Sequence, residues 1–185
     1  DISVGTAFDI ADKLSVRPER HVNEALIALH QMLLDMLPDA EQGYYRARLQ
    51  RLYGPRARAI GWSARPGESE EETLLRPTLL HAAGYLGRMP ELAAEAQRRV
   101  DRWLKTDRGL PPGIIETTLH IAAASGDAAL FERMLDALLR SKTPTRSHVL
   151  ARALGSFSDP HLIDRALAKL RDQRLDVESR PLLLM

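Results

Sequence analysis

Two ten-residue stretches in the second half of the chain, GDAALFERML at 126–135 and SDPHLIDRAL at 158–167, match each other at four positions. The matched pairs are Asp127 and Asp159, Leu130 and Leu162, Arg133 and Arg165, and Leu135 and Leu167. An aspartate just before a helix caps its free N–H groups, and a proline suits the first helical position. The match therefore predicts that one helical unit occurs twice, with Asp127 and Asp159 as the caps.

The same arrangement of two helices recurs along much of the chain. The first helix of each pair is expected at 78–87, 114–125 and 146–155, and the second at 90–104, 128–140 and 160–171. Repeats of 30–40 residues, each with two antiparallel helices, are typical of α-solenoids, in which stacking buries the apolar faces. We predict an all-α fold, an α-solenoid of antiparallel helix pairs resembling a HEAT or armadillo superhelix, as a single domain over 1–185.

The composition supports helices and excludes several classes of protein. Leu and Ala supply 54 of the 185 residues and the β-branched Val and Ile only 14, which favours helices over strands. The formal net charge is +1, and no stretch approaches the roughly 20 apolar residues of a membrane span. Because the chain has no cysteine, it forms no disulfide, no thiolate metal site and no cysteine nucleophile.

Further elements are predicted upstream of the repeats. Residues 22–37 form an amphipathic helix, and residues 41–53 form a more polar helix that ends before Gly54. Ser69 and Glu72 have the spacing of a capping box, in which each side chain binds the other residue's backbone N–H at a helix start. The apolar stripe expected on the first helix consists of Val22, Ala25, Leu26, Leu29, Leu33, Met36 and Leu37.

The sequence contains no motif for catalysis or metal binding. Its six histidines do not form HExxH, the spacing that places two imidazoles on one helix face to hold zinc. A phosphate-binding glycine loop and a nucleophile elbow are also absent. We therefore predict no catalytic, cofactor-binding or metal-binding residue in this chain.

Two histidines occupy similar places in their repeats, because His81 and His120 each precede a run of small residues. They are either polar groups on the concave face of the superhelix or partly buried side chains bonded to backbone carbonyls. The second interpretation is favoured.

The segment YYRARLQRLYGPRAR at 44–58 carries five arginines and three tyrosines, a pattern that occurs in nucleic-acid-binding helices. Because arginine outnumbers lysine 22 to 4 throughout a nearly neutral chain, a solvated helix face is the favoured interpretation. No nucleic-acid partner is expected. The arginines concerned are Arg46, Arg48, Arg51, Arg56 and Arg58.

One pattern is more specific than the others. It consists of Ile60-Gly61-Trp62, Gly67-Glu68-Ser69, Leu74-Leu75-Arg76 and Leu79-Leu80. This pattern resembles the C-terminal domain of the aminopeptidase N and puromycin-sensitive aminopeptidase family, which are zinc-dependent exopeptidases. The similarity covers about residues 49–181, including Leu110-Pro111-Pro112, whereas residues 1–48 match only as generic helices.

The resemblance marks five motif residues as structural or as lining a substrate chamber: Gly61, Trp62, Glu68, Ser69 and Arg76. Gly61 should let the backbone turn closely beside Trp62, which anchors a helix end. Arg76 stands among leucines, so it should pair with a carboxylate or carbonyl, or else extend into the superhelix cavity. Pro77 departs from the continuous helix of the family and should kink or restart the helix.

The resemblance also implies a function. The family's helical domain caps the catalytic and intermediate domains of the same polypeptide and walls in a chamber for the peptide substrate. Its zinc ligands lie in the upstream catalytic domain, so this chain alone should be inactive and should bind no zinc. The family's domain continues beyond the position of Met185, and we expect this chain to be a fragment of a larger C-terminal domain.

Two other functions remain open at this point. A free-standing HEAT- or armadillo-like scaffold would bind a protein partner on its concave face, and it would carry polar capping helices at both ends. A helical nucleic-acid binder would use the arginines of residues 44–58, and its binding would weaken steeply with salt.

Overall fold

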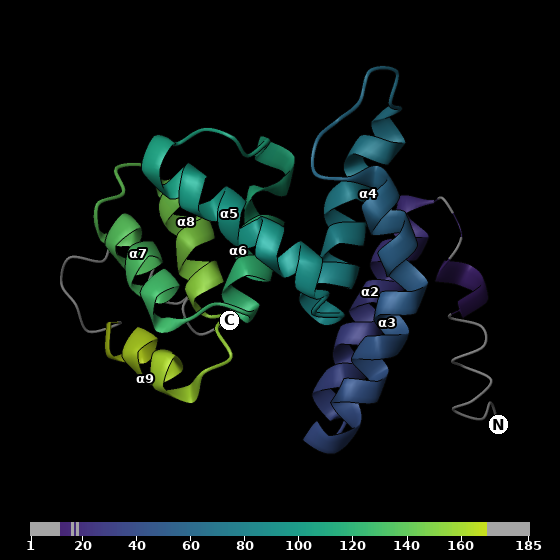
Figure 1. Cartoon of the computed structure of the whole chain (residues 1–185), viewed down its shortest axis with the longest axis horizontal. Helices are drawn as coiled ribbons and strands as arrows, with labels where there is room; N and C mark the ends of the chain where they lie inside the picture. Colours follow the sequence, from purple (N-terminus) through teal and green to yellow (C-terminus); the bar gives the residue numbers. More distant parts are fainter. Residues whose placement is uncertain (1–11, 16, 18, 170–185) are drawn as a thin grey trace. The chain divides into compact units, whose positions relative to one another are not determined.

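The computed structural model describes residues 12–15, 17 and 19–169, and the regular secondary structure in these residues is helical throughout (Figure 1). The prediction of an all-α fold is therefore confirmed. The elements are α2 (Arg20–Met36), α3 (Asp39–Ile60), α4 (Glu70–Leu80), the π-helix η1 (His81–Leu86), α5 (Pro90–Thr106), the 3₁₀-helix η2 (Pro112–Ile114), α6 (Ile115–Ala124), α7 (Ala128–Leu139), α8 (Pro144–Leu154) and α9 (Pro160–Lys169).

The chain divides into two compact units, one ending at Met89 and the other beginning at Pro90. A single superhelical domain over 1–185 stays a prediction.

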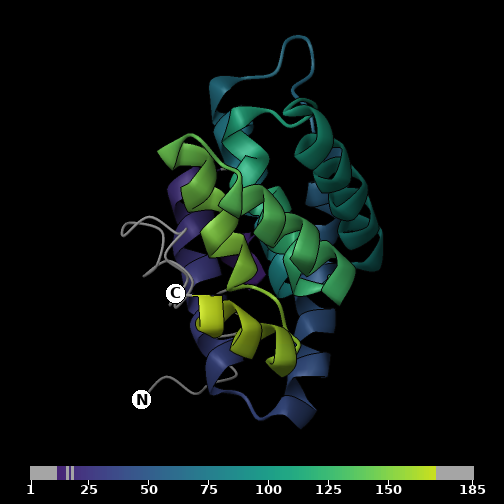
Figure 2. The ribbon, with the colours of Figure 1, turned by 90° about the vertical axis from the view of Figure 1, so that its left-hand side faces the viewer.

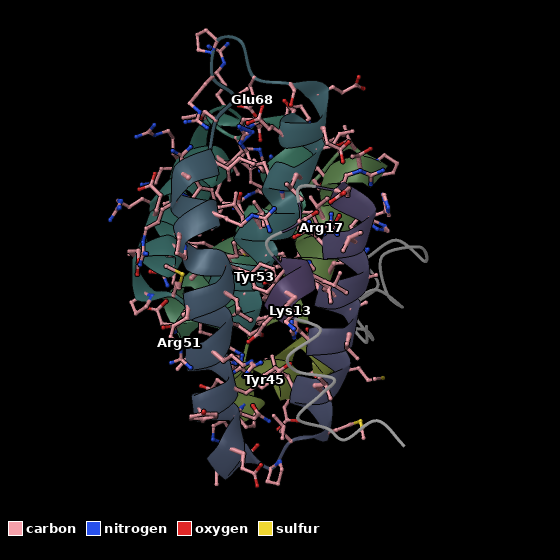
Figure 3. All side chains as sticks on the ribbon, turned by 90° about the vertical axis from the view of Figure 1, so that its right-hand side faces the viewer. Lys13, Arg17, Tyr45, Arg51, Tyr53 and Glu68 are labelled. Atoms are coloured by element: carbon pink, nitrogen blue, oxygen red, sulfur yellow. The ribbon has the colours of Figure 1, made fainter. Side chains whose placement is uncertain are left out.

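The first unit is built on three helices that run alongside one another (Figures 1 and 3). Helix α4 packs against α2 and α3, and η1 continues α4 along α3. Apolar side chains from all four elements form the core of this unit: Leu26, Ile27, Leu34, Leu49, Ala57, Leu75, Leu79, Leu80, Ala82, Ala83 and Leu86.

The buried face of α2 differs from the predicted apolar stripe. Leu29 is 36% exposed and Met36 is 74% exposed, whereas Asn23 and His30 are almost completely buried. Asn23 can be buried because its amide is satisfied: Nδ2 donates to the carbonyl oxygens of Arg17 and Glu19, at 2.9 and 2.8 Å. Helical periodicity located this helix correctly, but polar partners on other segments decide which face is inside.

The sequence predicts that this helix ends before Gly54. In the structure, α3 continues through Pro55 to Ile60. The glycine has a packing role, because a Cβ at position 54 would lie 3.0 Å from Sδ of Met89. A proline inside a helix removes one backbone hydrogen bond and crowds the preceding turn. Here the helix tolerates it, and the Gly-Pro pair does not act as a stop.

The helix of Arg76 also continues through its proline. Pro77 lies inside α4, which passes without interruption into the π-helix at His81, so the helix does not restart there, and a kink at Pro77 stays a prediction. Side chains of α3 bind the carbonyl groups at the end of this π-helix. Arg46 Nη1 donates to the carbonyl of Leu86 and Gln50 Nε2 to that of Gly87, both at 2.7 Å.

The packing of the second unit is made mainly by α5, α6, α7 and α8 (Figure 2), and the α-solenoid arrangement stays a prediction. Helix α6 packs against α5 and α8, α8 packs against α7, and α5 also contacts α7. The core contains an edge-to-face pair of Phe131 and Phe157, with ring centroids 5.3 Å apart. Gly126 is required at the α6–α7 turn, because a Cβ there would lie 2.7 Å from the Phe157 ring.

The two matched stretches behave as equivalent helix starts. Asp127 caps α7 by accepting the Leu130 N–H at 2.8 Å, and Asp159 accepts the His161 N–H at 2.9 Å before α9. The matched leucines, Leu130 and Leu162, are both buried. The predicted caps are therefore confirmed.

The matched arginines also have equivalent roles. Arg133 of α7 pairs with Asp101 of α5 at 3.0 Å, and Arg165 of α9 pairs with Glu132 of α7. Each arginine lies on the second helix of one pair, and it binds a carboxylate on the second helix of the pair that precedes it in the chain. This repetition is what stacked helix pairs would produce.

Candidate functional site

Four motif positions, Gly61, Trp62, Glu68 and Ser69, lie between the end of α3 and the start of α4. Gly61 follows the last residue of α3 with φ of 65°, in the region that favours glycine, and its N–H donates to the carbonyl of Ala57 at 3.1 Å. Apart from its two chain neighbours, a Cβ at position 61 would meet no atom within 4 Å. The positive φ is therefore the reason that glycine is needed here, and a close turn of the backbone beside Trp62 stays a prediction. Trp62 is half-buried beside it.

Glu68 and Arg76 form a buried ion pair (Figure 3 labels Glu68). Each side chain is only 3% exposed. Arg76 Nη1 donates to Glu68 Oε1 at 2.8 Å, and Nη2 donates to Oε1 and Oε2, each at 2.5 Å. The carboxylate interpretation of Arg76 is confirmed, and Arg76 does not extend into a cavity.

The loop backbone completes the environment of the Glu68 carboxylate. The N–H of Arg65 donates to Glu68 Oε2 at 2.9 Å. This hydrogen bond, together with the Arg76 guanidinium, lowers the pKa of Glu68 below its ordinary value, against the opposing effect of desolvation. The carboxylate is therefore ionised and its two oxygens are occupied by donors. Chemically, the pair suits an anchor that ties the α3–α4 loop to α4.

Ser69 starts α4 as the predicted capping box requires. Its Oγ accepts the Glu72 N–H at 3.2 Å, and Glu72 Oε2 accepts the Ser69 N–H at 3.0 Å. These hydrogen bonds lower the pKa of Glu72. Together with the Glu68–Arg76 pair, the cap fixes where the loop ends and the helix begins.

A buried polar cluster that the sequence analysis missed lies between α2 and α3. His30 Nδ1 is 2.6 Å from Tyr45 Oη, and His30 Nε2 is 3.1 Å from Tyr53 Oη. All three side chains are at most 4% exposed. In Figure 3 both labelled tyrosines lie on the α2 side of α3, whereas Arg51 points away from it. Their eight-residue spacing, with Leu49 midway, was a signal for a buried face.

Burial determines the protonation of this cluster. Desolvation, followed by the charge of Arg48, lowers the pKa of His30 to about 4, and desolvation raises the pKa of Tyr45 to about 12. The imidazole is therefore neutral at pH 7, with one nitrogen donating and the other accepting. The shorter distance suits an O–H···N bond from Tyr45 and the longer one an N–H···O bond to Tyr53.

The arginines of residues 44–58 are only partly solvated. Arg56 donates to Asn23 Oδ1 at 2.8 Å and to the carbonyls of Ser15 and Arg17. Arg48 pairs with Asp12 at 2.7 Å, and Arg46 binds η1. The prediction of a solvated helix face holds for Arg51 and Arg58, which are exposed. The other three hold parts of the first unit together.

His81 and His120 are both half-buried. The His81 ring stacks on the Tyr85 ring, with centroids 4.8 Å apart. His120 Nε2 lies 4.0 Å from Oε1 of Glu116, and burial lowers the pKa of His120 to about 4. His120 is therefore neutral at pH 7.

Two kinds of feature are absent from the part of the chain that the structure describes, a metal-binding cluster and a membrane-spanning helix. Within residues 12–15, 17 and 19–169, no group of three or more His, Asp or Glu side chains could hold a metal ion. The prediction that zinc belongs to another domain stays a prediction. In the same residues, no helix combines the length and the apolar character needed to cross a bilayer.

The capped α3–α4 loop and its buried ion pair belong to an all-α fold, in which the motif residues Glu68, Ser69 and Arg76 bind one another or the adjacent backbone. The family model described as the ERAP1-like C-terminal domain matches residues 1–179 of this chain. The chain belongs to this family, and it is a C-terminal domain of the aminopeptidase family. The match begins at residue 1, whereas the motifs quoted above covered about residues 49–181.

Proposed function

We propose that this chain is the non-catalytic C-terminal domain of a zinc-dependent aminopeptidase, capping its catalytic domain and forming part of the wall of the peptide chamber. The observation that carries the proposal is the family match over residues 1–179. The motif side chains agree with it, because Glu68, Ser69 and Arg76 satisfy one another or the adjacent backbone.

In such an enzyme, catalysis and the enclosure of the substrate would belong to different parts of one polypeptide. The zinc and its general base would belong to the catalytic domain, and the peptide substrate would be enclosed between the two. This chain would contribute shape and contact surface. A free-standing scaffold is not favoured, because the family consists of C-terminal domains.

The first test is enzymatic. The purified chain should hydrolyse no aminoacyl arylamide, with or without added zinc. Zinc-dependent turnover that a chelator abolishes would contradict the proposal.

The second test asks whether the catalytic partner exists and binds. The native reading frame upstream of the chain should encode HExxH with a third, glutamate ligand further along. The fragment that carries this motif should form a one-to-one complex with the chain in light scattering. An upstream frame without the motif would contradict the zinc enzyme, and failure to associate would contradict the capping role.

A further inference from the structure

The second unit contains a pocket of about 580 Å³, which lies where α5 and α7 end and where α6 and α8 begin. We call it the α8 pocket. Its apolar lining comes from Trp103, Pro112, Ile115 and Val149, and Arg140 and Lys142 add positive charge. This volume lies within the range of small-ligand sites, 300–1,000 Å³. None of the motif residues of the α3–α4 junction contributes to it.

The aromatic part of the lining is held in place. The Arg146 guanidinium lies 4.1 Å from the centroid of the Trp103 ring, and Arg146 also pairs with Asp107. Cation–π stacking of this kind fixes both side chains. Trp103 itself is only 5% exposed, so the apolar surface open to a ligand comes mainly from Pro112, Ile115 and Val149.

The cationic side chains that line the pocket, Arg140, Lys142 and Arg146, outnumber its two carboxylates, Asp107 and Glu116. Both acidic side chains in the pocket have partners, because Asp107 pairs with Arg146 and Glu116 pairs with Arg152 at 3.1 Å. Lys142 has no ion pair among the described residues. Arg140 pairs only loosely with Asp136, at 3.6 Å between side chains that are 75% and 61% exposed, which contributes little.

We propose that the α8 pocket binds an internal peptide segment in which a large apolar or aromatic residue is flanked by Asp or Glu. The apolar side chain would pack on Pro112, Ile115 and Val149, and the flanking carboxylates would pair with Arg140 and Lys142. A neutral or basic segment lacks the complementary charge, and an acidic segment without the apolar residue leaves the apolar lining in water. This proposal does not depend on the proposed function.

The test is an NMR titration of the ¹⁵N-labelled 185-residue chain with acetyl-Gly-Glu-Phe-Glu-Gly-amide, whose ends carry no charge. The indole N–H signal of Trp103 and the backbone signals of residues 140–149 should shift and saturate. Replacing both Glu of the peptide with Gln, or the Phe with Ala, should weaken binding by about tenfold. Acetyl-Gly-Gln-Phe with a free carboxylate tests whether a chain end is the true ligand.

The protein variant is Arg140→Gln with Lys142→Gln, which should also weaken binding by about tenfold. Arg98→Gln is the matched control, since Arg98 is an exposed cation of the same unit outside the pocket, and it should leave affinity within about twofold. The backbone spectrum of each variant checks that it is folded.

Four outcomes would overturn the proposal. They are the absence of a saturable shift up to about 1 mM peptide, equal binding of the Gln peptide, unchanged affinity in the double variant, and tighter binding of the peptide with the free carboxylate.

Discussion

At the scale of single residues, Glu68 and Arg76 form an ion pair in which each side chain is only 3% exposed. Two buried charges are costly to desolvate, and the cost is offset only when the geometry is good and further hydrogen bonds are made. Here the guanidinium contacts both carboxylate oxygens, and the Arg65 N–H adds a third donor. Removing one partner would leave the other buried without compensation.

Glu68→Gln is expected to lower the free energy of unfolding at pH 7. Because the pKa of Glu68 is lowered in the folded state, the stabilisation is present above its ordinary value of 4.5. It is lost as the pH falls through the folded-state pKa, so the wild type and the variant should converge below pH 4.5. Urea unfolding at several pH values measures this.

The control for this prediction is the double variant Glu68→Gln with Arg76→Met. It should be less destabilised than the sum of the two single variants, because neither buried charge is left alone. Strict additivity, or a difference that grows in acid, would contradict the role of the pair.

His30 is expected to make the protein acid-sensitive. Its pKa is about 4 when folded and 6.5 ordinarily, so below pH 6.5 only the unfolded state takes up the proton. Between pH 7 and pH 4 the wild type should lose about 3 kcal/mol more stability than His30→Gln, which does not titrate. An equal loss in both proteins would place the histidine in water. Denaturant unfolding monitored by circular dichroism measures the difference.

At the scale of elements, α3 shows that a glycine can be required by packing without ending a helix. Gly43 and Gly54 both lie inside α3, but only Gly54 has a close neighbour, at Met89. The Gly-Pro pair at 54–55 would be a stop signal in an isolated peptide. Here it lies within a helix whose buried face, including Leu49 and Tyr53, contributes to the core of the first unit.

Gly43→Ala is expected to stabilise the protein by roughly 0.5–1 kcal/mol, because alanine loses less backbone entropy and no neighbour lies within 4 Å of the new Cβ. Gly54→Ala should stabilise it less or destabilise it, because Met89 must move. Thermal unfolding of the two variants measures the contrast. Equal stabilisation would show that Met89 imposes no constraint on position 54.

At the scale of the whole molecule, the absence of a nucleic-acid partner stays a prediction, and the arginines of residues 44–58 bear on it. Arg46, Arg48 and Arg56 bind groups within the first unit, and the net charge of the chain is +1. Counterion release needs several cations that are able to contact phosphates. The arginine-rich segment mainly holds α3 to its neighbours.

The chain is therefore expected to bind neither duplex DNA nor single-stranded RNA with a dissociation constant below about 10⁻⁴ M at physiological salt. Fluorescence anisotropy with labelled 20-mers measures this. Tighter binding that weakens steeply between 50 and 200 mM salt would contradict the prediction and would restore the nucleic-acid hypothesis.

The sequence alone determined the all-α class, the helix starts at Asp127, Asp159 and Ser69, and the family. These features depend on signals that act within a turn or two of helix, or on motifs that lie along the chain. They could be predicted because each cap satisfies N–H groups only two or three residues away.

The tertiary structure alone decided which face of α2 is buried, whether α3 continues past Gly54, and which partner Arg76 takes. It also placed His30 between Tyr45 and Tyr53, 15 and 23 residues away. Burying a polar group is costly unless its hydrogen bonds are made, and those partners come from other segments. Local periodicity does not depend on such partners, so it placed Leu29 and Met36 on the buried face of α2 although both are exposed.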